Sequence, residues 1–152
     1  MNEYAVIIKS FAELTLDELY AILQCRSEVF GMEQEILYVD PDDMDQASVH
    51  IYVTDGQGKM ASYLRVIPPG VKFPHAASIG RVLTLPHWRG RGLARLLMEK
   101  AIDTALAMSD KIEIEAQAYL HDFYTSLGFQ PVSDVYILEG LPHVSMILSC
   151  SS

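Results

Sequence analysis

The sequence predicts an α/β fold of mixed α and β elements, in which a mixed central sheet of about six to seven strands is flanked by helices. Strand-like segments recur along the 152 residues, and segments with helical periodicity separate them. A loop rich in glycine and arginine joins one strand to the longest helix, which predicts a strand–loop–helix–strand crossover at the centre of the sheet. No repeat or linker divides the chain, so we expect one domain over residues 1–152.

The first elements expected along the chain are a strand and a helix. Tyr4–Ile8 has the composition of a strand. Thr15 and Glu18 form the pattern of a capping box, which marks the start of a helix. The apolar residues that follow recur at helical spacing, namely Leu19, Ile22, Leu23, Val29 and Phe30. Because glycine ends many helices, we expect this helix to end near Gly31.

A β-hairpin is expected after an irregular acidic loop. His50–Thr54 and Met60–Val66 read as two strands, and Asp55-Gly56-Gln57-Gly58 between them has the composition of a turn. Pro68 and Pro69 follow the second strand and lack the amide hydrogen that a sheet requires, so they end it.

The centre of the predicted fold is a strand over Ser78–Leu85 and a helix that extends to about Met108. The apolar residues of the helix share one face, namely Leu93, Leu96, Leu97, Ala101 and Ala105. Charged residues at four-residue spacing occupy another face. The amphipathic pattern therefore indicates a helix with one side buried.

The sequence of the C-terminal third predicts three more strands and a short helix. Ile112–Ala116 alternates in the manner of a strand, and Leu120–Ser126 reads as a helix that ends before Gly128. Val135–Leu138 and Val144–Leu148 are the last two expected strands.

Composition excludes several classes of partner. The formal net charge of -9 argues against nucleic acid, whose binding depends on Lys and Arg. No run approaches the roughly 18 apolar residues of a membrane span, and residues 1–4 lack the basic start of a signal peptide. We therefore expect a cytoplasmic protein with no membrane partner. Cys25 and Cys150 fit neither a disulfide framework nor a zinc site, so both are expected as reduced thiols.

Charge is distributed unevenly along the chain. No Lys or Arg lies between Arg26 and Lys59, where eight acidic residues fall: Glu28, Glu33, Glu35, Asp40, Asp42, Asp43, Asp45 and Asp55. Individually these aspartates read as a solvated turn, although their joint field favours a cationic ligand. A calcium loop begun at Asp40 would need an oxygen ligand, a glycine and a glutamate where Met44, Asp45 and Ile51 stand, so no metal is expected.

The glycine-arginine loop reads as an anion cradle. Gly90 and Gly92 allow backbone amides to turn toward a ligand, and the following helix presents the positive end of its dipole. Arg89, Arg91 and Arg95 repel one another unless an anion such as a diphosphate neutralises them. A dinucleotide site is a competing interpretation, but Arg95 stands where its fingerprint needs a third glycine.

The loop and a later segment resemble a known family. Arg89-Gly90-Arg91-Gly92-Leu93-Ala94 fits the phosphate loop of the GNAT superfamily of N-acetyltransferases, and Phe123–Phe129 is similar to its later tyrosine-containing motif. Shorter matches resemble the ElaA-like branch, namely Val29-Phe30, Glu33-Gln34, Ile79–Val82, Ala116–Ala118 and Pro142-His143. Together the matches span nearly the whole chain.

The resemblance implies a GNAT-like fold that binds acetyl-CoA. In such proteins the pantetheine arm pairs with the central strand and the pyrophosphate lies on the loop. The residues that correspond to these contacts are Val82, Leu83 and Thr84, followed by Arg89, Gly90, Arg91, Gly92, Leu93, Ala94 and Arg95. Gln117 matches a polar position near the coenzyme. Tyr124 matches the tyrosine that reaches the coenzyme sulfur, although its helical pattern alone favours an amphipathic helix residue beside Phe123 and Leu127.

The expected reaction is direct attack of a primary amine on the thioester in a ternary complex. A phenol such as Tyr124 suits protonation of the leaving thiolate. The central strand carries no carboxylate, so Glu33 and His50 are the candidate bases, acting through water. Glu33, Arg81 and His143 are the residues expected to contact the acceptor, and for Arg81 a structural pair with a carboxylate is equally open. The alternative function is a sensor or interaction module that binds acyl-CoA without catalysis.

The acceptor itself is predicted only by class. The acidic segment favours a cationic amine, either a small molecule or a peptide. A homodimer is left open by the sequence.

Overall fold

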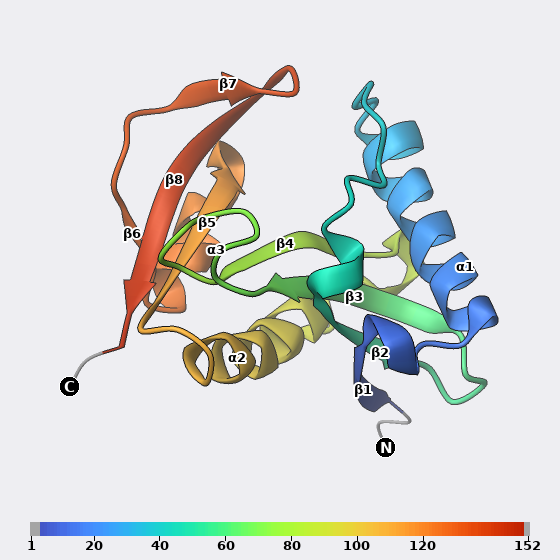
Figure 1. Cartoon of the computed structure of the whole chain (residues 1–152). Coiled ribbons are helices and arrows are strands. Elements are labelled where there is room, and N and C mark those ends of the chain that lie inside the picture. The colour runs from blue at the N-terminus through green and yellow to red at the C-terminus, as the bar shows by residue number, and fades with distance from the viewer. Residues whose placement is uncertain (1–3, 151–152) are drawn as a thin grey trace.

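The first sheet contains four strands, and each neighbouring pair is antiparallel (Figure 1). The computed structural model describes residues 4–150, so residues 1–3 and 151–152 of the predicted domain lie outside the described part. The strands lie side by side in the order β1 (Ala5–Ser10), β2 (Val49–Thr54), β3 (Met60–Ile67) and β4 (Ser78–Thr84). The predicted first strand, hairpin and central strand are confirmed to within two residues.

The second sheet is built around the last strand. β8 (Leu141–Ser149) pairs with β5 (Lys111–Gln117), with β6 (Gln130–Pro131) and with β7 (Tyr136–Leu138), in each case antiparallel. The sequence predicted three of these strands. It missed β6, which has two residues and includes a proline, so no alternating pattern marks it.

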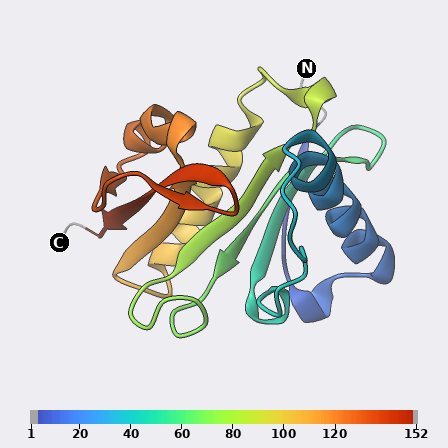
Figure 2. The same cartoon turned by 90° about the horizontal axis from the view of Figure 1, so that it is seen from above.

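A single parallel bridge joins the two sheets. The Ala77 amide donates to the Lys111 carbonyl at 3.2 Å, and the Glu113 amide donates to the Ala77 carbonyl at 2.9 Å. Within residues 4–150, β4 and β5 form no ladder beyond this point. The predicted crossover is confirmed, but the expected mixed sheet is two antiparallel sheets that touch at the start of two parallel strands. Figure 2 shows the two sheets side by side, with the C-terminal strands at the left.

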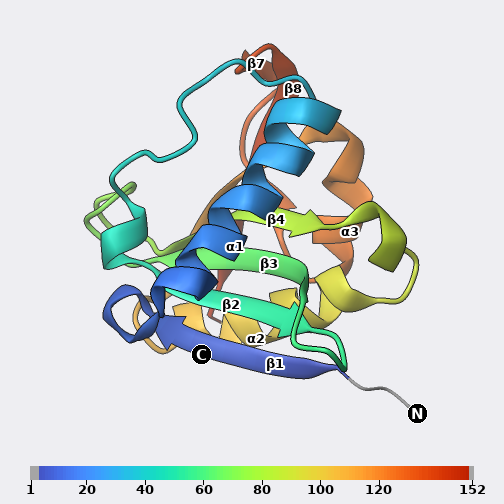
Figure 3. The same ribbon diagram turned by 90° about the vertical axis from the view of Figure 1, so that its right-hand side faces the viewer.

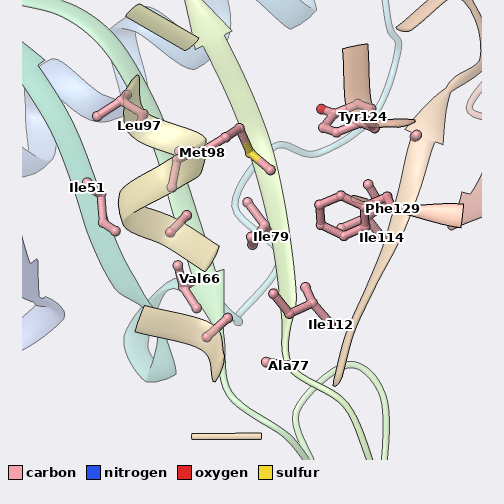
Figure 4. Close-up of a cluster of buried hydrophobic side chains, with 14 of the residues drawn as sticks. Ile51, Val66, Ala77, Ile79, Leu97, Met98, Ile112, Ile114, Tyr124 and Phe129 are labelled. Atoms are coloured by element: carbon pink, nitrogen blue, oxygen red, sulfur yellow. The ribbon is translucent and has the colours of Figure 1, made fainter. Parts of the chain in front are cut away.

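Helix α2 (Leu93–Leu106) covers one face of the first sheet and reaches the second sheet. Leu97 and Met98 point from α2 into a core that also receives Ile51, Val66 and Ile114 from the strands (Figure 4). Because both sheets contribute to this one cluster, the protein is held together by apolar burial across the gap between β4 and β5.

Helix α1 (Leu16–Arg26) covers the opposite face of the first sheet (Figure 3). Its start is capped as predicted, because the Glu18 amide donates to the Thr15 hydroxyl at 3.1 Å and the Thr15 amide donates to the Glu18 carboxylate at 2.8 Å. The side chains of β3 alternate between the two cores, and all eight of its residues are buried. The two-sided cover explains why both faces of this strand carry apolar residues.

The first helix ends within two residues of the predicted position near Gly31, but it does not end through a glycine conformation. A π-helical segment, η2 (Ser27–Glu33), continues from α1, and the Gln34 amide donates to the Val29 carbonyl at 3.0 Å. Gly31 is not among the residues with positive φ, so it does not adopt the left-handed conformation that ends a helix. As a result Glu33 and Gln34 are carried toward the end of β4.

The remaining elements are short. Helix α3 (His121–Ser126) ends before Gly128, whose φ is 106°, as the sequence predicted. Single turns of 3₁₀-helix occur at Phe11–Glu13, Asp45–Ala47, Pro86–Trp88 and Ala118–Leu120. In the part of the chain that the structure describes, no helix has the length and apolar character needed to cross a bilayer.

Candidate functional site

A β-bulge in β4 opens the space between the two sheets. Tyr63 and Arg65 on β3 are two positions apart, whereas their partners Leu83 and Gly80 on β4 are three apart. The extra residue lies in the stretch that contains Arg81, whose φ is 52°. A bulge bends and twists its strand. Because β4 meets β5 only at its start, the edge from residue 79 to residue 84 faces the gap without a strand partner.

Two cavities occupy this gap. The larger, which we call the loop cavity, has a volume of about 690 Å³ and is bordered by the end of β4, the glycine-arginine loop, the start of α2 and α3. The smaller, the sheet cavity, has a volume of about 160 Å³ and lies between β4, β5 and the end of η2. Five residues border both: Gln34, Val82, Tyr119, Leu120 and Tyr124. The two cavities therefore meet beside the bulge.

The loop that begins α2 holds two glycines in a conformation that other residues avoid. The φ values of Gly90 and Gly92 are 78° and 76°. A Cβ at either position would meet no atom within 4 Å, so it is the backbone angle and not crowding that requires glycine. No side chain caps α2, and its first helical hydrogen bond runs from the Leu96 amide to the Gly92 carbonyl at 3.1 Å. The amides of Leu93, Ala94 and Arg95 precede that ladder and border the loop cavity.

Arg89 has a carboxylate partner that the sequence did not predict. Its guanidinium donates to both oxygens of Glu33, at 2.7 and 2.6 Å, and its Nε donates to the Thr84 carbonyl at 2.9 Å. The hydrogen bond from Arg89 lowers the pKa of Glu33 below its usual value. A carboxylate with a lowered pKa accepts a proton less readily, so this pairing weakens the case for Glu33 as the base.

Arg91 and Arg95 have no carboxylate partner among residues 4–150. Arg91 stacks on Trp88 with 5.0 Å from its central carbon to the ring centre, and its side chain does not border the loop cavity. Arg95 borders that cavity, stacks on Phe123 at 5.5 Å, and donates to the Ser126 hydroxyl at 2.6 Å. Of these two side chains, only Arg95 is placed to contact a ligand in the loop cavity.

Tyr124 lies where the two cavities meet. Its side chain is 6% exposed, and its ring packs edge-on against Phe129 and Phe123. Figure 4 shows its hydroxyl directed toward β4. No group among residues 4–150 forms a hydrogen bond with this hydroxyl. Burial raises the pKa of Tyr124, so the phenol keeps its proton at neutral pH.

The sheet cavity brings together Gln117 and His143, and adds Gln34. The Gln117 amide donates to the Gln34 side-chain oxygen at 2.9 Å, which connects β5 to the end of η2. His143 borders the same cavity from β8. Gln117 borders this cavity and not the loop cavity. Gln34 was part of a short family match but carried no predicted role; its signal was its place next to Glu33.

Arg81 borders the sheet cavity and is ion-paired. Its Nε donates to an Asp40 carboxylate oxygen at 3.0 Å, a second nitrogen donates to the Asp40 carbonyl at 3.0 Å, and its guanidinium lies 4.9 Å from the ring centre of Tyr38. The structural pairing that the sequence left open is thus observed, and the bulge at the same residue turns it toward the cavity.

Arginines from other parts of the chain neutralise Asp40, Asp42 and Asp45 of the acidic segment. Asp45 bridges the buried side chains of Arg26 and Arg65 at 2.7 and 2.8 Å, while Asp42 pairs with Arg65 and Asp40 pairs with Arg26 at 2.8 Å. Burial alone would raise the pKa of Asp45, but the two arginines outweigh burial and lower it. The interpretation of these three carboxylates as a solvated turn is therefore wrong, because they are the counter-charges of buried arginines.

His50 does not meet the requirements of a base. Its side chain is 0% exposed and borders neither cavity. Its Nδ1 lies 2.6 Å from the Tyr63 hydroxyl and its Nε2 lies 2.9 Å from the Asp45 carbonyl. Burial lowers the pKa of His50, so it stays neutral. The structure thus corrects this prediction, since both ring nitrogens are already occupied away from the gap.

No group of three or more potential metal ligands lies close together in the described range 4–150.

The chain is similar to proteins of known family. The family model of the acetyltransferase (GNAT) domain matches residues 31–150. A UPF0039 protein of Schizosaccharomyces pombe is 34% identical over 151 residues, which cover 97% of this chain and 99% of that protein. Protein ElaA of Escherichia coli is 35% identical over 139 residues, which cover 89% and 90% of the two chains. The crystal structure of an acyl-CoA N-acyltransferase from Pseudomonas aeruginosa matches with a TM-score of 0.88 and 35% identity, over 96% of this chain and 99% of that one.

Proposed function

The chain belongs to the GNAT acetyltransferase family, in which it resembles ElaA, and from this premise we propose that it is an N-acetyltransferase that moves an acetyl group from acetyl-CoA to a primary amine. The observation that carries the proposal is the meeting of two cavities at Tyr124 and Val82. A two-substrate reaction needs both substrates on one reacting centre, and this junction offers it.

The loop cavity is suited to the donor. Its volume of about 690 Å³ falls within the range of small-molecule sites. The amides at the start of α2 and the cation of Arg95 are groups that bind a diphosphate. The open edge of β4 at Val82, Leu83 and Thr84 offers backbone groups to an amide-containing arm. The Thr84 carbonyl already accepts from Arg89 and the Leu83 carbonyl accepts from the Ser62 hydroxyl at 2.7 Å, so Val82 has the most free capacity of the three.

The proposed reaction is a direct displacement. The amine nitrogen forms a bond to the thioester carbon while the carbon–sulfur bond breaks, and the thiolate takes the proton of the Tyr124 phenol. The phenol, which burial keeps protonated, regains its proton from water after the products leave. No covalent enzyme intermediate is needed. Cys25 is buried in α1 and burial raises its pKa to about 11, so it is a poor nucleophile.

The sheet cavity is the proposed acceptor site, and a cationic amine of small-molecule or peptide type is the proposed substrate class. The acidic segment no longer supports this class, because its carboxylates are paired with arginines. Glu115 at the cavity is paired with Lys72. Glu139, exposed in the turn before β8, has no ion pair among residues 4–150 and borders the cavity, so it is the group that would attract an ammonium.

The direct test measures binding and turnover separately. Calorimetry with CoA and acetyl-CoA tests the donor site, and release of CoA from acetyl-CoA is followed against a panel of amines, with an amine-free control for hydrolysis. We expect binding and amine-dependent release. Binding without release for any amine would favour the sensor, and absence of binding would overturn the donor assignment.

Tyr124→Phe tests the proposed acid. The substitution removes one hydroxyl from a packed ring, so we expect kcat to fall about 100-fold or more while acetyl-CoA affinity changes little. Tyr20→Phe is the matched control, because Tyr20 is exposed on α1 and borders neither cavity. An unchanged kcat in Tyr124→Phe would eliminate the phenol as the acid.

A further inference from the structure

With Glu33 paired and His50 enclosed, the proposed reaction lacks a group that removes the proton of the amine. His143 is the histidine that borders the sheet cavity among residues 4–150. It lies on β8 directly opposite Gln117 of β5. Residues paired in this way present their side chains to the same face of a sheet, and both border the cavity. The backbone register of the second sheet therefore fixes this imidazole at the acceptor site.

The hydrogen bond of His143 defines which ring nitrogen is free. Its Nδ1 lies 2.8 Å from the Leu141 carbonyl oxygen, which can only accept. Nδ1 is therefore the donor, and in the neutral ring Nε2 carries the lone pair. Within the described residues 4–150, no group forms a hydrogen bond with this Nε2. The lone pair is available to a molecule in the cavity.

The ring is also held in place. The Tyr136 ring of β7 stacks on it at 6.3 Å between centres and an interplanar angle of 25°. The side chain of His143 is 7% exposed, so it has little freedom to turn into solvent. His50 provides the contrast, because its Nε2 donates to the Asp45 carbonyl and its Nδ1 accepts from Tyr63. Of these two buried histidines, one is saturated by the protein and the other offers a base to a cavity.

Resting on the proposed acetyl transfer, we propose that His143 Nε2 is the general base that accepts the proton of the attacking amine. The ammonium first loses one proton to solvent, so that its nitrogen carries a lone pair. As the nitrogen of this neutral amine forms its bond to the acetyl carbon, a second proton passes from nitrogen to Nε2, and the Tyr124 proton passes to the leaving sulfur. After the step, His143 is an imidazolium with one extra proton and Tyr124 is a phenolate that lacks one. Solvent accepts the proton of the imidazolium and returns a proton to the phenolate. The net change is one N–H and one C–S bond exchanged for one N–C and one S–H bond.

Several titratable and charged groups lie around His143. Tyr136 faces the ring from β7. Leu141 on β8 contributes only its carbonyl. The titratable and charged groups that border the same cavity are Glu115 and Lys72, which pair with each other, Arg81 and Arg65, which pair with aspartates, and Glu139, Tyr38, Tyr119 and Tyr124. Glu139 is the anion among these without an ion pair in residues 4–150.

The first test reads the tautomer and needs no substrate. Nitrogen-15 NMR of the histidine-labelled protein distinguishes a protonated Nδ1 from a protonated Nε2. We expect the neutral ring of His143 to carry its proton on Nδ1 and that of His50 to carry it on Nε2, with His143→Asn used to assign the signal. A proton on Nε2 of neutral His143 would overturn the proposal.

The second test separates a base from a structural residue. His143→Asn places an amide near the position of Nδ1, where it can still donate to Leu141, but it removes Nε2. We expect kcat to fall about 100-fold or more, with acetyl-CoA affinity and the unfolding midpoint close to wild type. A primary amine loses its own proton only near pH 10. We therefore expect wild-type kcat/KM to show a further inflection at lower pH that is absent in His143→Asn.

His75→Asn is the matched control, since His75 is exposed in a loop and borders neither cavity. An unchanged pH profile in His143→Asn, or loss of the lower inflection in Glu33→Gln instead, would overturn the assignment while leaving acetyl transfer intact. Wild-type protein that binds acetyl-CoA but acetylates no amine would overturn the function and the base together.

Discussion

The acidic segment Asp40–Asp45 and the arginine loop Arg89–Arg95 are both clusters of like charge in the sequence, but only the first is neutralised by the rest of the fold. Each gathers charges of one sign into a few positions. Asp45 in the first is met by Arg26 and Arg65, which are almost fully buried. In the second, Arg89 has a carboxylate partner, whereas Arg91 and Arg95 have none among residues 4–150. A cluster of like charge therefore indicates a ligand only where the rest of the chain supplies no counter-charge.

Burial explains the difference between the two regions. Buried guanidinium groups must be paired, because an isolated charge in a protein interior is costly. The aspartates of the acidic segment therefore serve the fold. The Arg89 side chain is 44% exposed and can exchange its partner for a ligand at small cost. The acidic segment thus contributes to stability, and the loop is free for binding.

Asp45→Asn should cause the largest change, and it should act on stability. The substitution keeps the shape of the side chain but leaves two buried guanidinium groups short of a counter-charge. We expect the free energy of unfolding to fall by about 3 to 5 kcal/mol, measured by chemical denaturation. Asp43→Asn is the matched control, because Asp43 is exposed, has no ion pair in residues 4–150, and should change stability by less than about 0.5 kcal/mol. Equal effects of the two substitutions would contradict the claim that the paired aspartates stabilise the fold.

The same ion-pair network predicts how the stability of the fold changes as the pH falls. The folded pKa of Asp45 lies below its unfolded value of about 3.9, so its contribution is complete above that value and is lost as the pH falls through the folded pKa. Wild type should therefore lose stability as the pH falls below about 4, and the gap to Asp45→Asn should narrow over the same range. Denaturation series at several pH values measure this gap, and a constant gap would argue against ionic pairing of Asp45.

Much of the fold could be predicted because local patterns carry it. The capping box at Thr15, the hairpin turn after β2 and the glycines at Gly90 and Gly92 each act through residues within a few positions. The family of the chain was also recognisable, since the motif Arg89–Ala94 is one continuous segment. The π-helical hydrogen bonding of η2, which carries the first helix two residues past Gly31, was not predicted because it has no local signal.

Partners distant in sequence could not be predicted. Arg26 and Asp45 are 19 positions apart, and Arg89 and Glu33 are 56 apart, so no local pattern connects them. The prediction of His50 as a base is wrong because strand periodicity gives no information about cavities. His50 lies on a strand whose two faces are both covered by helices, and the period of a strand does not tell which covered face opens onto a cavity.

Arg95→Gln should cause an intermediate change, and it should act on binding. Arg95 borders the loop cavity, so removal of its charge should weaken acetyl-CoA binding by about 1.5 to 3 kcal/mol, or roughly ten- to hundredfold. Salt should weaken the binding of wild type more steeply than that of the variant, because screening acts on exposed charges. Calorimetry at two ionic strengths measures both effects.

Arg91→Gln is the internal control for this experiment. It removes the same charge from the same loop, but Arg91 stacks on Trp88 outside the cavity. We expect a loss of affinity well below that of Arg95→Gln. If the two variants lose affinity equally, binding depends on the summed field of the loop and not on contact at one position.

Glu33→Gln should cause the smallest change, and of opposite sign. In this structure Glu33 holds Arg89 in a two-point pair at the mouth of the loop cavity, where a phosphate would compete with it. An exposed pair of this kind contributes up to about 1 kcal/mol, so acetyl-CoA affinity should rise by up to about fivefold. The same variant also shows whether Glu33 takes part in the chemistry. If Glu33 only competes with the ligand for Arg89, kcat should stay near wild type. A large fall in kcat with unchanged affinity would instead return Glu33 to the role of base, and would show that the partner of an exposed arginine can also take part in the chemistry.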